Sequence, residues 1–108
     1  MIAYTRKVGI IVNVIKSFAD KETETIFHQE FSRRVPQTIQ RIALRKLMMI
    51  DAAEKLSDLK TPPANRLEPL VGNRIGQWSI RINNQWRICF TPNANGSEYE
   101  NVEIVDYH

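Results

Sequence analysis

The sequence predicts a single α+β domain, because helical periodicity in its first half gives way to strand-like alternation in its second half. With 108 residues, the chain is long enough for one hydrophobic core and too short for two. Its composition, 43% hydrophobic and 25% charged, is that of a globular protein and differs from that of a disordered chain. Thr61-Pro62-Pro63 is expected to end the helical half, and the alternation begins near Arg66.

The first apolar segment, Val8 to Phe18, is rich in β-branched residues and is expected to form a strand. Arg6-Lys7 followed by Val8 to Ile15 resembles a short secretion signal. Asn13 interrupts that segment and no small-residue cleavage site follows it, so we expect a cytoplasmic protein. No stretch approaches the length of a membrane span, and we expect no membrane partner.

Two helices are expected to follow this strand. Asp20 is a suitable N-cap for a helix that runs to about Glu30, and acids in its first turn favour the helix dipole. Pro36 suits the start of a second helix that runs to about Ala53.

The second helix is expected to present a basic face to solvent. On a helical wheel, Arg41 and Arg45 lie opposite an apolar stripe. The stripe consists of Ile39, Ala43, Leu47 and Ile50. Lys46 falls among the apolar residues, and we expect its stem to lie on the core while its ammonium reaches solvent; the alternative is a role in a site. The acid-free run Phe31 to Ile50 and the net charge of +3 admit a polyanionic partner, although a solvated helix face explains such a run equally well.

The β half contains a hairpin whose register follows from its apolar pattern. The alternating apolar residues are Trp78, Ile80 and Ile82 on one strand and Trp86, Ile88 and Phe90 on the next. Burying both sets on one face requires Ile82 to lie opposite Trp86, with Asn83-Asn84-Gln85 as a loop in which an Asn adopts the left-handed conformation. Arg81 and Arg87 then stand opposite each other on the other face. Because opposed like charges repel, we expect an anion between them, either a protein carboxylate or a phosphate.

The chain ends on Asp106, Tyr107 and His108, three groups that can move or steer protons. The apolar strand Val102 to Val105 is expected to hold them in place. Alternation puts Asp106 and His108 on one side of this strand and Tyr107 on the other, and which side carries the arginines stays open. Cys89 is expected to be a small buried residue, with a reactive thiolate as the alternative.

These segments together resemble the HigB-type toxins of the RelE superfamily, the plasmid-maintenance killer protein family. The resemblance runs from about Val14 to His108, and it rests on Asn65-Arg66-Leu67-Glu68, Gly72-Asn73-Arg74, Trp78 to Asn83, Gln85 to Phe90 and Val102 to His108. It implies a RelE-like α+β fold, with two N-terminal helices packed on a twisted, mainly antiparallel sheet. It also implies a type II toxin that acts as a ribosome-dependent endoribonuclease on messenger RNA in the ribosomal A site, without a metal or other cofactor.

The implied partners are the ribosome, its messenger RNA and a HigA-like helix-turn-helix antitoxin, with operator DNA bound only through the antitoxin complex. An alternative is a weakly catalytic or non-catalytic homologue that binds the antitoxin or the ribosome and co-regulates its promoter. A third hypothesis, direct DNA binding by the helix Pro36 to Ala53, is disfavoured because no second recognition helix follows before the Pro-Pro break.

A metal-free ribonuclease needs a base for the ribose 2′-hydroxyl, cations for the phosphorane charge and an acid for the leaving 5′-oxygen. By resemblance, Arg87 is the phosphate clamp and His108 the acid–base residue, while Asp106 and Tyr107 orient or assist it. The alternatives are a salt bridge of Arg87 to a carboxylate and a frayed chain end at His108. The side chains expected to bind RNA or the ribosome are Arg41, Arg45, Lys46, Arg66, Arg74 and Arg81.

This chain departs from the family pattern at two places. Some members carry a histidine and a lysine in the segment that corresponds to Leu67 to Val71, where this chain has Glu68 and Val71. Glu68 can serve as general base, but Val71 cannot supply the missing charge, so we expect a slower nuclease. Trp86 and Tyr99 are alternative stacking faces for a base, although Trp86 falls on the core side of the hairpin.

The second departure is at the front of the chain. Family members typically open with Met-Ile-x-Ser-Phe, and Val14-Ile15-Lys16-Ser17-Phe18 has Val at the initiator position. Met1 to Asn13 is then either upstream sequence from a mis-called start at a GTG codon or a genuine extra strand. In both cases we expect residues 1–108 to contain one toxin domain.

Overall fold

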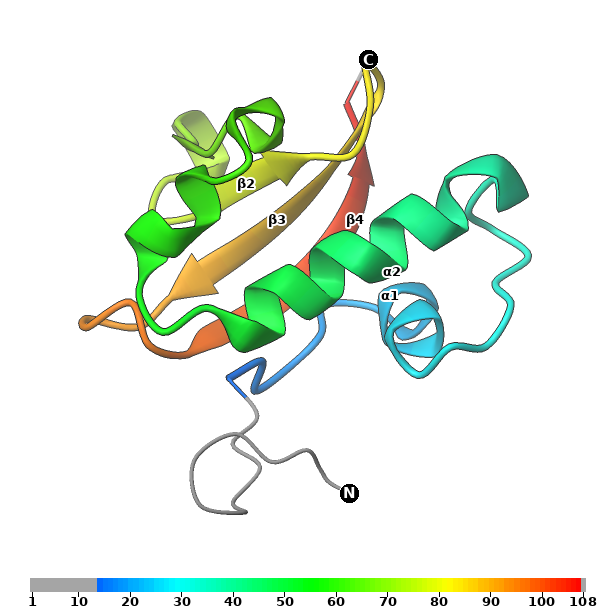
Figure 1. The fold of residues 1–108 in the computed structure, drawn as a ribbon, viewed down its shortest axis with the longest axis horizontal. Helices are drawn as coiled ribbons and strands as arrows, with labels where there is room; N and C mark the ends of the chain where they lie inside the picture. The colour runs from blue at the N-terminus through cyan, green and yellow to red at the C-terminus, as the bar shows by residue number, and fades with distance from the viewer. Residues whose placement is uncertain (1–13, 108) are drawn as a thin grey trace.

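The computed structural model describes residues 14–107, which form an antiparallel sheet of four strands with two α-helices on one face (Figure 1). The helices are α1 (Lys21–Phe27) and α2 (Gln37–Ala52). The strands, which are neighbours in chain order, are β1 (Glu68–Pro69), β2 (Trp78–Arg81), β3 (Trp86–Pro92) and β4 (Tyr99–Asp106). Short 3-10 helices in the connections are η1 (Leu56–Lys60), η2 (Pro63–Asn65) and η3 (Gly72–Arg74). The predicted α+β class and the order of helices before strands are confirmed.

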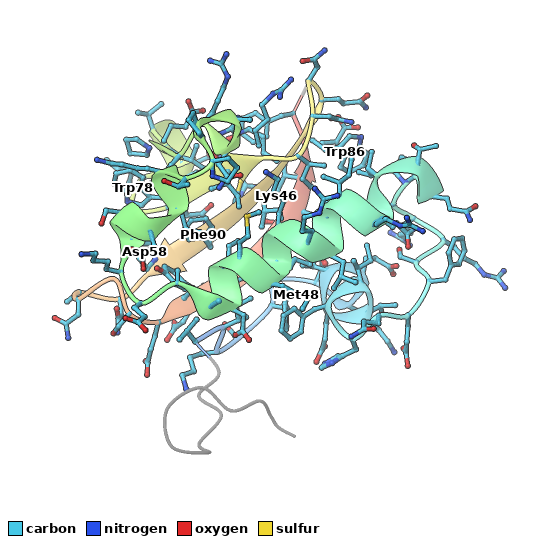
Figure 2. The ribbon with its side chains drawn as sticks, in the orientation of Figure 1. Lys46, Met48, Asp58, Trp78, Trp86 and Phe90 are labelled. Atoms are coloured by element: carbon cyan, nitrogen blue, oxygen red, sulfur yellow. The ribbon has the colours of Figure 1, made fainter. Side chains whose placement is uncertain are left out.

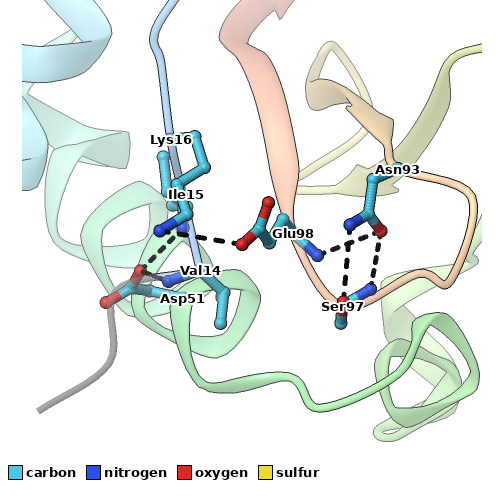
Figure 3. Close-up of polar contacts among 7 residues, drawn as sticks. All are labelled: Val14, Ile15, Lys16, Asp51, Asn93, Ser97 and Glu98. Atoms are coloured by element: carbon cyan, nitrogen blue, oxygen red, sulfur yellow. Dashed lines mark hydrogen bonds and ion pairs between the residues drawn. The ribbon is translucent and has the colours of Figure 1, made fainter.

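Residues 14–18 are extended, but they do not form a continuous strand. Isolated parallel bridges at Ile15 and Phe18 join them to β4. The Asp51 carboxylate at the end of α2 accepts hydrogen bonds from the backbone nitrogens of Val14 and Ile15, at 3.1 and 3.0 Å (Figure 3). Within the described residues, the predicted first strand is thus a tethered extended segment. Its earlier part, like the two interpretations of Met1 to Asn13, lies outside those residues.

Both predicted helices are present. The Asp20 carboxylate accepts a hydrogen bond from the Thr23 nitrogen at 2.7 Å, which confirms Asp20 as the N-cap of α1. This helix ends at Phe27, before the predicted Glu30, and Gln29 just beyond it adopts a left-handed φ of 66°. The second helix runs from the N-cap Pro36 close to its predicted end. In residues 14–107, no helix is both long enough and apolar enough to cross a membrane.

The core lies between α2 and the near face of the sheet. The predicted stripe of α2 is buried, and Ala43, Leu47 and Ile50 have no exposed surface. It packs in one cluster with the predicted core row of the sheet, including Ile88 and Phe90. Arg41 and Arg45 are exposed, so the predicted basic face of α2 does point to solvent.

Lys46 differs from its prediction. Figure 2 shows it between α2 and the sheet, and only 8% of the residue is exposed. Its ammonium donates a hydrogen bond to the buried Asn65 amide oxygen instead of reaching solvent. The prediction of a solvent-reaching ammonium is therefore wrong, because an internal amide takes the place of water as its hydrogen-bond acceptor.

The hairpin register is confirmed. Arg81 pairs with Arg87, and the Ile82 nitrogen donates to the Trp86 oxygen at 2.8 Å. The loop differs in detail, because no Asn between β2 and β3 has a positive φ. Instead, the Asn83 side-chain oxygen accepts hydrogen bonds from the backbone nitrogens of Gln85 and Trp86, both at 2.8 Å. A side-chain acceptor thus stabilises this turn without a left-handed residue.

The burial of Tyr99 leads us to expect that the protein loses stability in strong alkali. It is fully buried, and its hydroxyl donates to the Gly96 oxygen at 2.9 Å. Burial, with a smaller contribution from Asp58, raises the pKa of Tyr99 from 10.0 to about 12. The folded state therefore keeps a proton that the unfolded state releases, so this contribution is complete below pH 10 and is lost as the pH rises towards about 12. Urea unfolding from pH 9 to 11.5 should show a free energy that falls by roughly 1–2 kcal/mol more in the wild type than in Tyr99→Phe. Equal pH slopes in the two proteins would contradict this.

Candidate active site

The face of the sheet that points away from α2 carries polar side chains from all the strands of the sheet, and we call it the arginine face. Residues paired across antiparallel strands share a face, so the pairing assigns its members directly. They are Glu68 on β1, Ser79 and Arg81 on β2, Arg87 and Cys89 on β3, and Glu103 and Val105 on β4. Tyr107 follows with the same parity, which answers the question that the sequence left open. The phenol, and not Asp106, lies on the side of the arginines.

Arg87 lies at the centre of this face and is almost buried, with 9% of the residue exposed. Its Nε donates to the Ser79 hydroxyl at 2.7 Å. One terminal amino group, NH2, donates to the Arg66 carbonyl at 2.6 Å and more weakly to the Ser79 carbonyl at 3.4 Å. The other, NH1, forms no hydrogen bond within residues 14–107. The guanidinium is thus held in one orientation with one donor edge left for a ligand.

Glu68 is the anion next to Arg87. Its Oε2 lies 3.7 Å from the Arg87 NH2, and about half of its side chain is exposed. Glu68 thus supplies a protein carboxylate beside Arg87, whereas the Arg81 NH2 donates to Asn84, so an anion between the two opposed arginines stays a prediction. The separation between Glu68 and Arg87 makes theirs a loose ion pair, and the exposure leaves the carboxylate accessible to solvent and to a substrate.

Arg74 reaches the arginine face from η3. Its NH1 lies 3.3 Å from a Glu103 carboxylate oxygen and donates to the Gln77 side-chain oxygen at 2.9 Å. Arg66 contributes its carbonyl to Arg87 and is itself exposed. Of these two predicted cations, Arg74 therefore brings its guanidinium to the same face as Arg87, whereas Arg66 reaches Arg87 through its backbone carbonyl.

Tyr107 and Cys89 form a pair on this face. Burial raises the pKa of the Cys89 thiol, and the residue is fully buried, which confirms its predicted structural role. Burial also raises the pKa of Tyr107, and the neighbouring Cys89 adds to this, while Arg74 and Arg87 act in the opposite direction. Tyr107 is nevertheless 40% exposed, so its neutral phenol can both donate a hydrogen bond and meet a ligand.

Arg81 and Asp106 lie at the hairpin end of the sheet. Arg81 is opposite Arg87, and its NH2 donates to the side-chain oxygen of Asn84. Asp106 pairs with Trp86 and so has the parity of the helical face. The Gln85 amide donates to both Asp106 carboxylate oxygens, at 3.1 and 3.2 Å. His108, which follows in sequence, lies outside the described residues, so its predicted role is untested.

The remaining predicted RNA-binding residues are not on the arginine face. Arg41 and Arg45 lie on the exposed side of α2, and Lys46 is buried beneath that helix. The two alternative stacking residues also differ from each other. Tyr99 is fully buried and cannot stack on a base, whereas Trp86 is partly buried and packs against the core.

Two residues of the site were not identified from the sequence. Ser79 holds the Arg87 Nε, and its position opposite Cys89 follows from the hairpin register, so alternation alone could have found it. Asn65 has no such pattern, because its importance comes from a buried hydrogen bond to α2. Across residues 14–107, no group of three His, Cys, Asp or Glu side chains is arranged as metal ligands.

Comparison with known proteins agrees with this architecture. A family model for RelE-like toxins of the type II toxin–antitoxin system HigB matches residues 16–108. Toxin HigB-1 of Vibrio cholerae is 43% identical over 74 residues, which cover 68% of this chain and 78% of that protein. Endoribonuclease HigB of Proteus vulgaris is 38% identical over 96 residues, which cover 88% of this chain and 100% of that protein.

Among solved structures, the YoeB/ParE toxin from Agrobacterium tumefaciens superposes with a TM-score of 0.51 at 22% identity, covering 87% of this chain and 96% of that one. This likeness concerns the fold alone. The match of the family model over most of the chain, together with the two relatives, shows that the protein belongs to the HigB-type toxins of the RelE superfamily.

Proposed function

We propose that this toxin is an endoribonuclease that cleaves messenger RNA in the ribosomal A site without a metal ion. The observation that carries the proposal is the Arg87 guanidinium, held in place by Ser79 and the Arg66 carbonyl beside the accessible Glu68 carboxylate. The similar protein of Proteus vulgaris that bears the name Endoribonuclease HigB supports the endoribonuclease part of this proposal.

In the proposed reaction, Glu68 takes the proton of the ribose 2′-hydroxyl, and the resulting oxygen attacks the adjacent phosphorus. Arg87, assisted by Arg74, balances the charge that develops on the phosphorane oxygens. The bond from phosphorus to the 5′-oxygen then breaks, and His108 protonates that leaving oxygen. The products are a 2′,3′-cyclic phosphate and a 5′-hydroxyl end. Tyr107 and Asp106 are proposed to orient the phosphate and the imidazole, respectively.

The proposed partners follow from the family. A type II toxin is paired with an antitoxin, and we propose a HigA-like helix-turn-helix protein through which the pair also binds its operator DNA. The proposed working site is the cytoplasm, where ribosomes carry the substrate.

The test is to map 5′-hydroxyl RNA ends in cells after brief induction of the wild type and of His108→Ala. New ends in register with codons, present with the wild type and absent with the variant, are expected. Asn95→Ala, an exposed change in the turn between β3 and β4 at the other end of the sheet, is the matched control and should cleave as the wild type does. Arrested growth without new ends would contradict a nuclease, and new ends bearing 5′-phosphates would contradict the cyclising mechanism.

A second candidate function is inhibition by binding alone, through the ribosome or through antitoxin-dependent repression. It is favoured by one observation, namely that protein acceptors already occupy the Nε and NH2 groups of Arg87. Growth arrest that survives both His108→Ala and Arg87→Ala, with no RNA ends, would support it over the nuclease.

The exposed arginines of α2 are expected to contribute to ribosome binding. Arg41→Glu/Arg45→Glu should weaken binding to purified ribosomes and lower the salt dependence of the affinity by roughly one unit of log–log slope for each lost phosphate contact. The matched control, Lys21→Glu/Lys60→Glu, makes the same change in net charge at exposed positions elsewhere. Equal weakening by both double variants would show that only net charge matters.

A further inference from the structure

A buried hydrogen-bond chain connects the helical side of the sheet to Arg87. It begins at Lys46, one of the buried residues of α2. Its ammonium donates to the Asn65 side-chain oxygen, and burial together with Arg45 and Arg81 lowers the pKa of Lys46. A buried cation next to other cations opposes folding, and the hydrogen bond to Asn65 offsets part of this cost.

Asn65 is the second member of the chain. It is fully buried at the end of η2, and its side-chain nitrogen donates to the carbonyls of Leu59 and Thr61 at 3.1 and 3.2 Å. Its oxygen has Lys46 as its partner. The amide therefore uses both ends to tie the turn formed by η1 and η2 to α2.

Arg66 is the third member and has a strained backbone. Its φ and ψ of 46° and 56° are left-handed, a conformation that costs free energy for a residue with a Cβ. This conformation directs the Arg66 carbonyl to the Arg87 NH2, at 2.6 Å. The residue immediately before it is the one that Lys46 holds, so a change at Lys46 acts next to the strained peptide.

We propose that Lys46 and Asn65 are positioning residues for Arg87: they hold Arg66 in its left-handed conformation and, through its carbonyl, fix the guanidinium on the opposite face of the sheet. The kinetic consequence rests on the proposed nuclease function. The structural consequence does not, because the Arg87 side chain can be observed without an activity assay.

The experiment compares wild type, Lys46→Met and Lys46→Gln. The methionine removes both the charge and the donor, while the glutamine keeps an amide donor for Asn65 without the charge. The Arg87 Nε–H donates to Ser79, so its exchange with solvent in NMR spectra reports how firmly the guanidinium is held. We expect exchange about tenfold faster in Lys46→Met, as for the loss of one hydrogen bond, and largely restored in Lys46→Gln. In the cleavage assay, kcat should fall about tenfold in Lys46→Met with KM within about twofold of the wild type.

Lys21→Met is the matched control, because it makes the same chemical change at an exposed position of α1 and should change neither readout. If Lys46→Met does not fold, Arg66→Ala and Arg66→Asn replace it. Both remove the guanidinium of that residue, but Asn tolerates the left-handed conformation, so only Ala should accelerate the exchange of Arg87.

Unchanged Arg87 exchange in Lys46→Met, or in Arg66→Ala where that pair is used, would overturn the proposal. Equal losses in Lys46→Gln and Lys46→Met would overturn it too, since they would show that the charge and not the donor matters. If Arg87 exchanges faster in Lys46→Met than in the wild type, but the wild type cleaves no RNA, the positioning role is supported and the nuclease function is rejected.

Discussion

Arg87→Lys is expected to reduce cleavage of ribosome-bound messenger RNA by about 100- to 1000-fold, the usual effect of removing a donor that stabilises transition-state charge. The Arg87 Nε and NH2 are held by separate acceptors on Ser79 and Arg66, while NH1 is left for a ligand. A lysine ammonium is a single point charge and cannot meet two fixed acceptors and a phosphate at once. Single-turnover cleavage with purified ribosomes measures the effect.

Arg87→Lys also changes a nearly buried residue, so folding must be measured beside activity. We expect the free energy of unfolding to fall by about 1–3 kcal/mol, because buried acceptors lose their partner. Arg34→Lys, at an exposed position before α2, is the matched control and should change neither quantity. A folded Arg87→Lys protein with wild-type cleavage would remove Arg87 from the reaction and leave it a structural role in the sheet.

Glu68→Gln is expected to lower the cleavage rate about 100-fold if the carboxylate is the general base. The change keeps the size of the side chain and removes its ability to accept the 2′-hydroxyl proton. It also removes the negative charge that lies 3.7 Å from Arg87, so binding of the RNA phosphate should be equal or tighter. A fall in kcat without a rise in KM is therefore the expected pattern.

Glu100→Gln provides the matched control for Glu68, because it makes the same chemical change at an exposed position of β4. A Glu68→Gln protein that cleaves at the wild-type rate would show that Glu68 only neutralises Arg87. The base would then have to come from elsewhere, and the proposed assignment of proton transfers would be wrong.

The elements of the fold could be predicted because each depends on neighbours in the sequence. Asp20 caps α1 through a residue three positions away, and the apolar stripe of α2 repeats with each turn of the helix. The pairing of Arg81 with Arg87 follows from burying two alternating apolar rows across a short loop. These features depend on residues close together in the chain, so they can be predicted from the sequence.

The partners of the site residues could not be predicted in the same way. The connections between α2 and β2 supply the Arg66 carbonyl, Glu68 and Arg74, and these segments have no periodicity. The left-handed conformation of Arg66 has no sequence pattern either, because the residue is not a glycine. Similarly, nothing local indicates that Lys46 would find Asn65 and remain buried.

The sequence by itself determined the fold class, the hairpin register, the outward-facing arginines of α2 and the family resemblance. Each of these depends on the spacing of residues close together in the chain or on short motifs. Only the tertiary structure decided that Tyr107 shares a face with Arg87, that Glu68 is the nearby anion, and that Lys46 and Arg74 have the partners Asn65 and Glu103. The physical reason is that these contacts join residues far apart in the chain. Their geometry depends on how every intervening loop packs against the core.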